Sequence, residues 1–167
     1  MQALSSNEQS GSLAVSLLRI TLGLIVLATW VSNVSKGLYG AEEFKGFLGW
    51  LASPDGNAGS LGFFHSLLDA VVVPGASFFG PLQLVVELVI GIGLTLGLLT
   101  RFFTLLAGGF FLTLFLAYFG GHEWLGTYIL LFMAAVTVFL GYGGRRFGLD
   151  EFLTQSRRDS PAGNLLW

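Results

Sequence analysis

One apolar stretch with a carboxylate inside it constrains this chain more than any other feature. Residues 79–101 read FGPLQLVVELVIGIGLTLGLLTR, and roughly 20 apolar residues are enough to cross a bilayer as a helix. Glu87 lies near the middle of this stretch. A charge at that depth costs at least about 2.5–3.5 kcal/mol unless it is paired, protonated or hydrated. The stretch therefore predicts either a structural contact inside a helix bundle or a role in proton or ligand chemistry.

The composition indicates a membrane protein with several spans. Of the 167 residues, 53% are hydrophobic and 11% are charged, whereas soluble domains have about 25% charged residues. The net charge of −2 and the lack of a basic stripe argue against nucleic-acid binding. The chain contains no cysteine, which excludes disulfides, thiolate metal sites and iron–sulfur ligation. We find no metal-binding or flavin-binding motif.

Four apolar segments predict an all-α fold, a polytopic membrane four-helix bundle within residues 13–153. The spans cover about residues 13–34, 79–100, 102–119 and 124–142. We expect residues 1–12 to form a disordered cytoplasmic tail and residues 154–167 a polar C-terminal tail.

The long connection between the first two spans, residues 35–78, is not a plain loop. Two of its stretches, residues 41–52 and 60–74, have apolar residues at helical spacing and are too short and too polar to span a membrane. They predict short amphipathic helices that lie at the membrane interface in the first outer loop.

The distribution of basic residues predicts the orientation of the bundle. The side with both termini carries most of them: Arg19, Arg101, Arg145, Arg146, Arg157 and Arg158. The other side has only Lys36 and Lys45. Because basic residues are enriched in cytoplasmic loops, we expect both termini in the cytoplasm and the long connection outside, in a prokaryotic cytoplasmic (inner) membrane.

Two interpretations of Glu87 remain open at this point. In the functional one, Glu87 is a proton acceptor or ligand contact, about 12 Å below the outer boundary at a helical rise of 1.5 Å per residue. In the structural one, it pairs with Arg19 from below, or with Lys36 and Asn33 from above. Of the two cations, we expect Arg19 to point toward Glu87.

Further candidates lie near the predicted ends of the spans. Four aromatic residues could line a site for a quinone headgroup, although aromatic residues at that depth also form the ordinary interfacial belt. They are Trp30, Trp50, Tyr118 and Trp124. His122 could change its charge near neutral pH in an outer turn, or be a solvated turn residue. Asp150 is expected, with the arginines at 145–146, at the start of a C-terminal helix, where it could pair with an arginine; alternatively these residues contact lipid phosphates.

Four pieces of the chain resemble the DoxX/DoxD family of four-span membrane proteins. They are LLRITLG at 17–23, SKGLYG at 35–40, VELVIGIGLTLGLLTR at 86–101 and GGRRFGLDEFL at 143–153. The long first connection and the stretch HEWLGTYILL look more like the DoxD branch than the DoxX branch. The resemblance covers about residues 13–153.

The resemblance implies a membrane subunit of a thiosulfate:quinone oxidoreductase. Electrons from thiosulfate would pass to a quinone, with formation of tetrathionate and participation of a second subunit. On this hypothesis Glu87 is the catalytic candidate, because quinone reduction needs protons that a buried carboxyl could relay. Candidate contacts to the quinone or to an anion are Arg19, Trp30, Asn33, Lys36, Tyr118 and His122.

An alternative hypothesis is a non-catalytic accessory subunit packed against a larger respiratory or photosynthetic membrane complex. No cysteine or flavin motif is present to store electrons, so we do not expect this chain to be catalytic alone. Under either hypothesis the expected partners are membrane lipids and a second subunit or larger complex.

Overall fold

The described residues of the computed structural model, 6–51, 61–119, 126–141 and 147–150, form helices and turns and contain no strand. The prediction of an all-α fold is therefore confirmed for this part of the chain. The elements are α1 (Ser6–Ser35), α2 (Ala41–Leu51), α3 (Gly62–Leu67), the π-helix η1 (Leu68–Val72), α4 (Ala76–Leu96), α5 (Thr100–Ala117) and α6 (Gly126–Leu140).

Within the described residues, three helices are long and apolar enough to cross a membrane: Gly11–Ser35 within α1, the whole of α4, and the whole of α5. Helix α6 is apolar but has only 15 described residues. Parts of the predicted fourth span, residues 124–125 and 142, lie outside the described residues. The helices indicate a multi-pass membrane protein, and the number of four spans stays a prediction.

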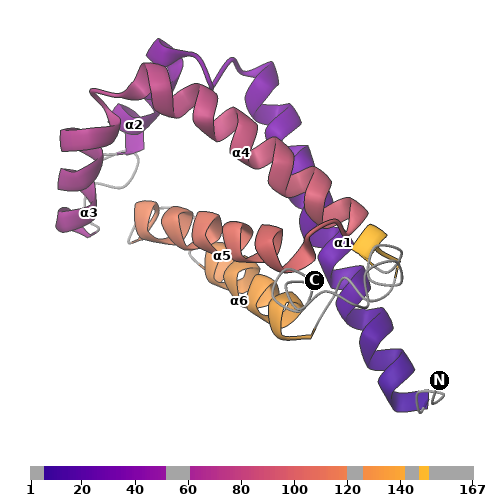
Figure 1. The fold of residues 1–167 in the computed structure, drawn as a ribbon. Helices are drawn as coiled ribbons and strands as arrows, with labels where there is room; N and C mark the ends of the chain where they lie inside the picture. The colour runs from indigo at the N-terminus through magenta and orange to yellow at the C-terminus, as the bar shows by residue number, and fades with distance from the viewer. Residues whose placement is uncertain (1–5, 52–60, 120–125, 142–146, 151–167) are drawn as a thin grey trace, which may run out of the picture.

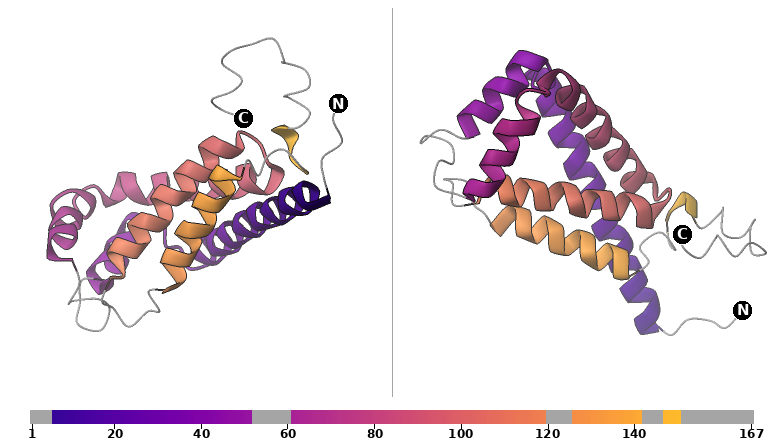
Figure 2. Two further views of the ribbon diagram at one scale, coloured as in Figure 1. Left: turned by 90° about the horizontal axis from the view of Figure 1, so that it is seen from below. Right: turned by 60° about the vertical axis from the view of Figure 1, so that its left-hand side comes forward.

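The long helices are arranged as two pairs. Helices α1 and α4 run antiparallel and side by side, and α5 lies beside α6 (Figures 1 and 2). The two pairs meet at the short turn from α4 to α5, and α3 lies near the other end of α5 (Figure 1). There Phe64 of α3 packs in one cluster with Ala117 of α5.

The turn between α4 and α5 takes only three residues, 97–99. Gly97 ends α4 in the left-handed conformation, with φ of 65°, and Leu99 precedes α5 with φ of 45°. Glycine adopts positive φ at no steric cost, which explains its place at the end of the helix.

Close packing between α1 and α4 sets how the two helices are aligned. A Cβ at Gly91 of α4 would lie 2.7 Å from Leu27 Cγ, and one at Gly23 of α1 would overlap Thr95. The two helices can approach this closely because both positions lack a side chain. The buried core beside them contains Leu22, Val26, Ile90, Leu94, Ala107, Phe111, Ala135 and Val138.

The connection between α1 and α4 contains the two short helices that the sequence predicts, observed as α2 and as α3 with η1. Helix α2 begins with Glu42 and Glu43, where acidic side chains favour a helix N-terminus. Its apolar face packs on the start of α4 through Phe44, Leu48 and Ala76. A location of these helices at a membrane interface remains a prediction.

Candidate functional site

Glu87 lies on α4 and is fully buried, with 0% of its surface exposed. Its Oε2 accepts hydrogen bonds from the Tyr39 hydroxyl at 2.6 Å and from Asn33 Nδ2 at 3.3 Å. Its Oε1 accepts one from Gln83 Nε2 at 2.7 Å. We call Glu87, Tyr39, Asn33 and Gln83 the Glu87 cluster. Hydrogen bonds from three side chains of the protein thus satisfy the buried carboxyl.

Three separate parts of the chain bring these donors together. Gln83 lies one turn before Glu87 on α4, so the two share a helix face. Asn33 comes from the last turn of α1, and Tyr39 from the turn that follows it. A Cβ at Gly80 would lie only 2.5 Å from the Tyr39 carbonyl oxygen. Glycine at this position therefore lets the Tyr39 backbone rest directly on α4.

The three side chains that donate to Glu87 are uncharged, and one of them, Tyr39, carries an ionisable hydroxyl. Burial raises the pKa of Tyr39 above its ordinary value, the hydrogen bond to Glu87 adds to this, and a hydrogen bond with Asn33 opposes it. Tyr39 therefore keeps its proton at physiological pH and acts as a donor. A hydroxyl and a carboxyl in direct contact can pass a proton between them.

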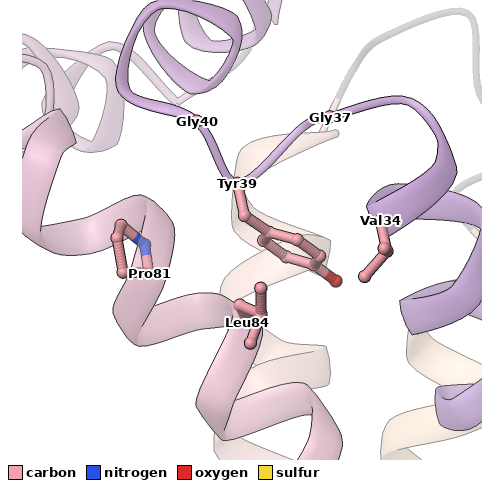
Figure 3. Close-up of a pocket in the computed structure, with 6 residues that line it drawn as sticks. All are labelled: Val34, Gly37, Tyr39, Gly40, Pro81 and Leu84. Atoms are coloured by element: carbon pink, nitrogen blue, oxygen red, sulfur yellow. The ribbon is translucent and has the colours of Figure 1, made fainter.

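A pocket of about 310 Å³ adjoins the cluster at Tyr39. Figure 3 shows the Tyr39 side chain between the 34–40 segment on one side and α4 on the other. The residues that line the pocket are Val34, Gly37, Tyr39, Gly40, Pro81 and Leu84. Tyr39 thus belongs both to the pocket and to the buried cluster.

The predicted contact between Arg19 and Glu87 is wrong. Arg19 is also fully buried, at 0% exposed, but its Nη2 donates to the Phe147 carbonyl oxygen at 2.9 Å. Its guanidinium lies so close to Gly97 that a Cβ there would overlap it. Arg19 does not reach Glu87 because the antiparallel packing of α1 and α4 places Asn33 beside Glu87. Arg19 is about 21 Å from Asn33 along α1, at 1.5 Å per residue, and therefore lies beside the other end of α4.

Asp150 completes a second buried site at the turn from α4 to α5. Its carboxylate accepts hydrogen bonds from the backbone N–H of Leu99 at 2.7 Å and of Thr100 at 2.8 Å. Its own N–H donates to the Gly97 carbonyl oxygen at 2.9 Å. We call Arg19, Gly97, Phe147 and Asp150, with the N-terminus of α5, the Arg19 cluster.

The structure adds a role for Asp150 that the sequence does not predict. Residues 149 and 150 are helical, as expected for the start of a C-terminal helix, and Asp150 interacts with the charge of Arg19, but its side chain also caps α5, 50 residues earlier in the chain. An acidic side chain at a helix N-terminus satisfies free N–H groups and interacts favourably with the helix dipole. The arginines at 145–146 lie outside the described residues.

The remaining predicted site residues are spread over the molecule. Trp30 lies near the Glu87 cluster, where its Nε1 donates to the Leu84 carbonyl oxygen at 3.1 Å. Lys36 is exposed and, within the described part of the chain, provides no hydrogen bond to Glu87. Tyr118 follows α5 and stacks on Tyr128 at 5.0 Å between ring centroids. His122 lies outside the described residues.

Of the predicted contacts, the structure therefore brings Asn33 to Glu87 and does not bring Arg19 or Lys36. Two members of the cluster, Tyr39 and Gln83, were not singled out from the sequence. Gln83 carries a recognisable signal, because it is a polar residue four positions before a carboxylate within an apolar helix. Tyr39 had no such signal, since its contact depends on how the turn folds back on α4.

The described residues also limit the kinds of site that can be considered. No group of three or more His, Cys, Asp or Glu side chains in the described ranges could hold a metal ion.

Comparison with protein families matches residues 14–166 to the DoxD family, described as "TQO small subunit DoxD". No curated protein and no solved structure matched the chain.

Proposed function

The chain belongs to the DoxD family, and from this membership we propose that it is a membrane subunit of a thiosulfate:quinone oxidoreductase. The family match over nearly the whole chain is the observation that carries the proposal. The long apolar helices agree with a subunit that meets its quinone within the lipid phase.

The reaction of such an enzyme has a defined need for protons. Two thiosulfate ions join through a new S–S bond to form tetrathionate and release two electrons. Quinone takes up these two electrons together with two protons to form the quinol. Thiosulfate oxidation releases no protons, so they must reach the quinone from the protein or from water.

On this proposal Glu87 supplies protons to the quinone. The support is a fully buried carboxyl whose hydrogen-bond donors in the described part of the chain are uncharged, and one of these donors, Tyr39, lines a pocket. A positioned acid of this kind contributes about 100- to 10,000-fold to a proton-transfer step. The electrons are supplied by thiosulfate oxidised at a second subunit, because this chain has no cysteine for redox chemistry.

The proposal also includes an orientation. With the arginine-rich side in the cytoplasm, the Arg19 cluster lies toward the cytoplasm and the Glu87 cluster toward the outside. Helices α2 and α3 then cover the outer end of a four-span bundle.

The test is thiosulfate-dependent reduction of a soluble short-chain quinone by the purified chain together with its partner subunit. We expect Glu87→Gln to lower kcat by about 100-fold or more. The matched control is Asp69→Asn, which removes an exposed carboxylate on η1 and should leave kcat unchanged.

Two results would count against the proposal. Absence of thiosulfate-dependent reduction by a stable assembly would overturn the enzymatic assignment. Full turnover by Glu87→Gln would remove Glu87 from the mechanism and favour a non-catalytic accessory subunit.

A further inference from the structure

We propose that the pocket beside Tyr39 holds the headgroup of the quinone, and that Tyr39 hands to it the protons that Glu87 supplies. This inference rests on the proposed function and goes further, because it assigns the binding site, the class of ligand and the residue that touches it.

The pocket matches a quinone headgroup in size and in chemical character. Its volume is about 310 Å³, and small-molecule sites are typically apolar with a few placed polar groups. The lining side chains of Val34, Pro81 and Leu84 are apolar, and the Tyr39 hydroxyl lies among them (Figure 3). A quinone headgroup is a flat apolar ring with carbonyl acceptors, and one hydroxyl donor suits it.

The same lining argues against thiosulfate as the occupant. A dianion requires Arg, Lys or a cluster of backbone N–H groups to replace its hydration. No lysine or arginine is among the six residues that line the pocket. Thiosulfate must therefore react elsewhere, and only the apolar substrate of the pair fits here.

An isoprenoid tail has a direct route from this pocket into the lipid phase. Val34, at one edge, is 43% exposed, and Pro81, on α4, is also exposed. Both belong to the apolar exterior of the α1–α4 pair, which would face lipid. The headgroup can thus reach Tyr39 laterally, without crossing a polar surface.

The geometry behind Tyr39 provides the proton path. The Tyr39 hydroxyl oxygen lies 2.6 Å from Glu87 Oε2. When Glu87 is protonated, its carboxyl can donate to the Tyr39 oxygen, which leaves the Tyr39 proton for the quinone oxygen. The Tyr39 O–H bond then breaks as a new O–H bond forms on the reduced quinone, and the Glu87 proton replaces the one lost.

After each transfer Glu87 is a carboxylate and Tyr39 is neutral again. The Gln83 and Asn33 side chains already donate to this carboxylate, so they stabilise the state that remains. Glu87 then takes a proton from water, and a second transfer completes the quinol. In this scheme Tyr39 is the residue that touches substrate, while Gln83 and Asn33 are positioning residues.

Binding alone tests the location of the site. The probe is a decyl-substituted benzoquinone, titrated by calorimetry into the purified chain in mild detergent, without thiosulfate. We expect Val34→Trp, which fills the pocket, to weaken the Kd by about tenfold or more. The matched control is Val31→Trp, one turn earlier on the exposed face of α1 and not part of the lining, which should bind as the wild type does.

The outcomes of this titration are distinct. Wild-type affinity in Val34→Trp would overturn the site, and so would equal weakening in both tryptophan variants. Thermal unfolding of both variants checks that each is folded. No thiosulfate is present in this titration, so weaker quinone binding in Val34→Trp alone supports the site whether or not the complex turns over thiosulfate. A complex without thiosulfate-dependent turnover would defeat only the proposed function.

A second variant tests the role of the Tyr39 hydroxyl. Tyr39→Phe keeps the ring that lines the pocket and removes the proton donor. We expect its quinone Kd to stay within about threefold of the wild type, since the apolar contacts remain, while kcat falls about 100-fold. A purely structural role would lower thermal stability without this split between Kd and kcat. Unchanged kcat would exclude Tyr39 as the donor.

Discussion

The two buried carboxyls of this protein, Glu87 and Asp150, are held in opposite ways. Glu87 is 0% exposed and contacts three uncharged side chains. Asp150 is 3% exposed, binds two backbone N–H groups at a helix N-terminus, and interacts with the charge of Arg19. Burial alone therefore says little about the role of a carboxyl, and the charge of its partners says more.

The difference has a physical consequence. Removing the charge from Asp150 leaves a buried guanidinium and a helix N-terminus without their counter-charge, which is costly. Among the described residues, removing the charge from Glu87 strands no cation, because its partners Asn33, Tyr39 and Gln83 are neutral. The Arg19 cluster is thus suited to hold the fold together, whereas loss of the charge at Glu87 is expected to cost less stability.

Replacing Asp150 by its amide has the largest expected effect on stability. We expect Asp150→Asn to lower the free energy of unfolding by about 3 kcal/mol, since an amide cannot accept from both N–H groups and leaves Arg19 uncompensated. Thermal unfolding in mild detergent measures it, with the exposed Asp69→Asn as control. A change below about 1 kcal/mol would mean that Asp150 is an ordinary cap.

A glycine substitution breaks the Glu87 cluster through its backbone. In Gly80→Ala, the new Cβ would lie 2.5 Å from the Tyr39 carbonyl oxygen, and we expect a loss of about 2 kcal/mol from this overpacking. The control is Gly109→Ala on α5, where no atom lies within 4 Å of the added Cβ. There the better helix propensity of alanine should stabilise the protein by up to about 1 kcal/mol. Equal shifts in both variants would contradict close contact at Tyr39.

Glu87→Gln makes the corresponding change at the other buried carboxyl, because it replaces the carboxylate by an amide. The amide keeps the shape of the side chain, and the amides of Gln83 and Asn33 can turn to present oxygen where nitrogen was. We therefore expect only about 1 kcal/mol of destabilisation, the cost of one altered hydrogen bond, by the same unfolding measurement. A loss as large as that of Asp150→Asn would show that Glu87 has a charged partner.

The smallest expected effect concerns pH. The pKa of Tyr39 is raised in the folded protein above the ordinary value of 10.0, so the unfolded chain loses this proton first as pH rises. Wild-type stability should then fall relative to Tyr39→Phe, by roughly 0.4 kcal/mol at pH 10 and more above it. Below about pH 9 the difference should be constant with pH. A wild type that gains stability relative to Tyr39→Phe above pH 10 would reverse the assigned direction.

The helices were predictable because they depend on local sequence. The long apolar segments predict α1, α4 and α5, and the apolar spacing after Glu42 and Glu43 predicts α2. The burial of Glu87 and the approach of Asn33 were also predictable, because both lie at matching depths on neighbouring spans.

The partners of the two buried charges were not predictable in the same way. They depend on the alignment of α1 with α4, which is set by contacts such as that of Gly91 with Leu27. A long side chain such as Arg19 can reach along the helix in either direction, so depth alone does not choose its partner. The contact of Tyr39 with Glu87 was not predictable because it depends on a turn that folds back on Gly80, which lies 41 positions after Tyr39.

The capping of α5 by Asp150 also has a consequence for the order of events during synthesis. The N–H groups of Leu99 and Thr100 have no carboxylate to bind until Asp150, 51 and 50 positions later, has been synthesised. At about 5–20 residues per second, this interval is about 3 to 10 seconds. During that time α5 is synthesised while its first turn and Arg19 still lack their carboxylate. A chain that stops before Asp150 would keep this turn permanently uncapped, which gives membrane quality control a physical difference between a finished and an unfinished copy.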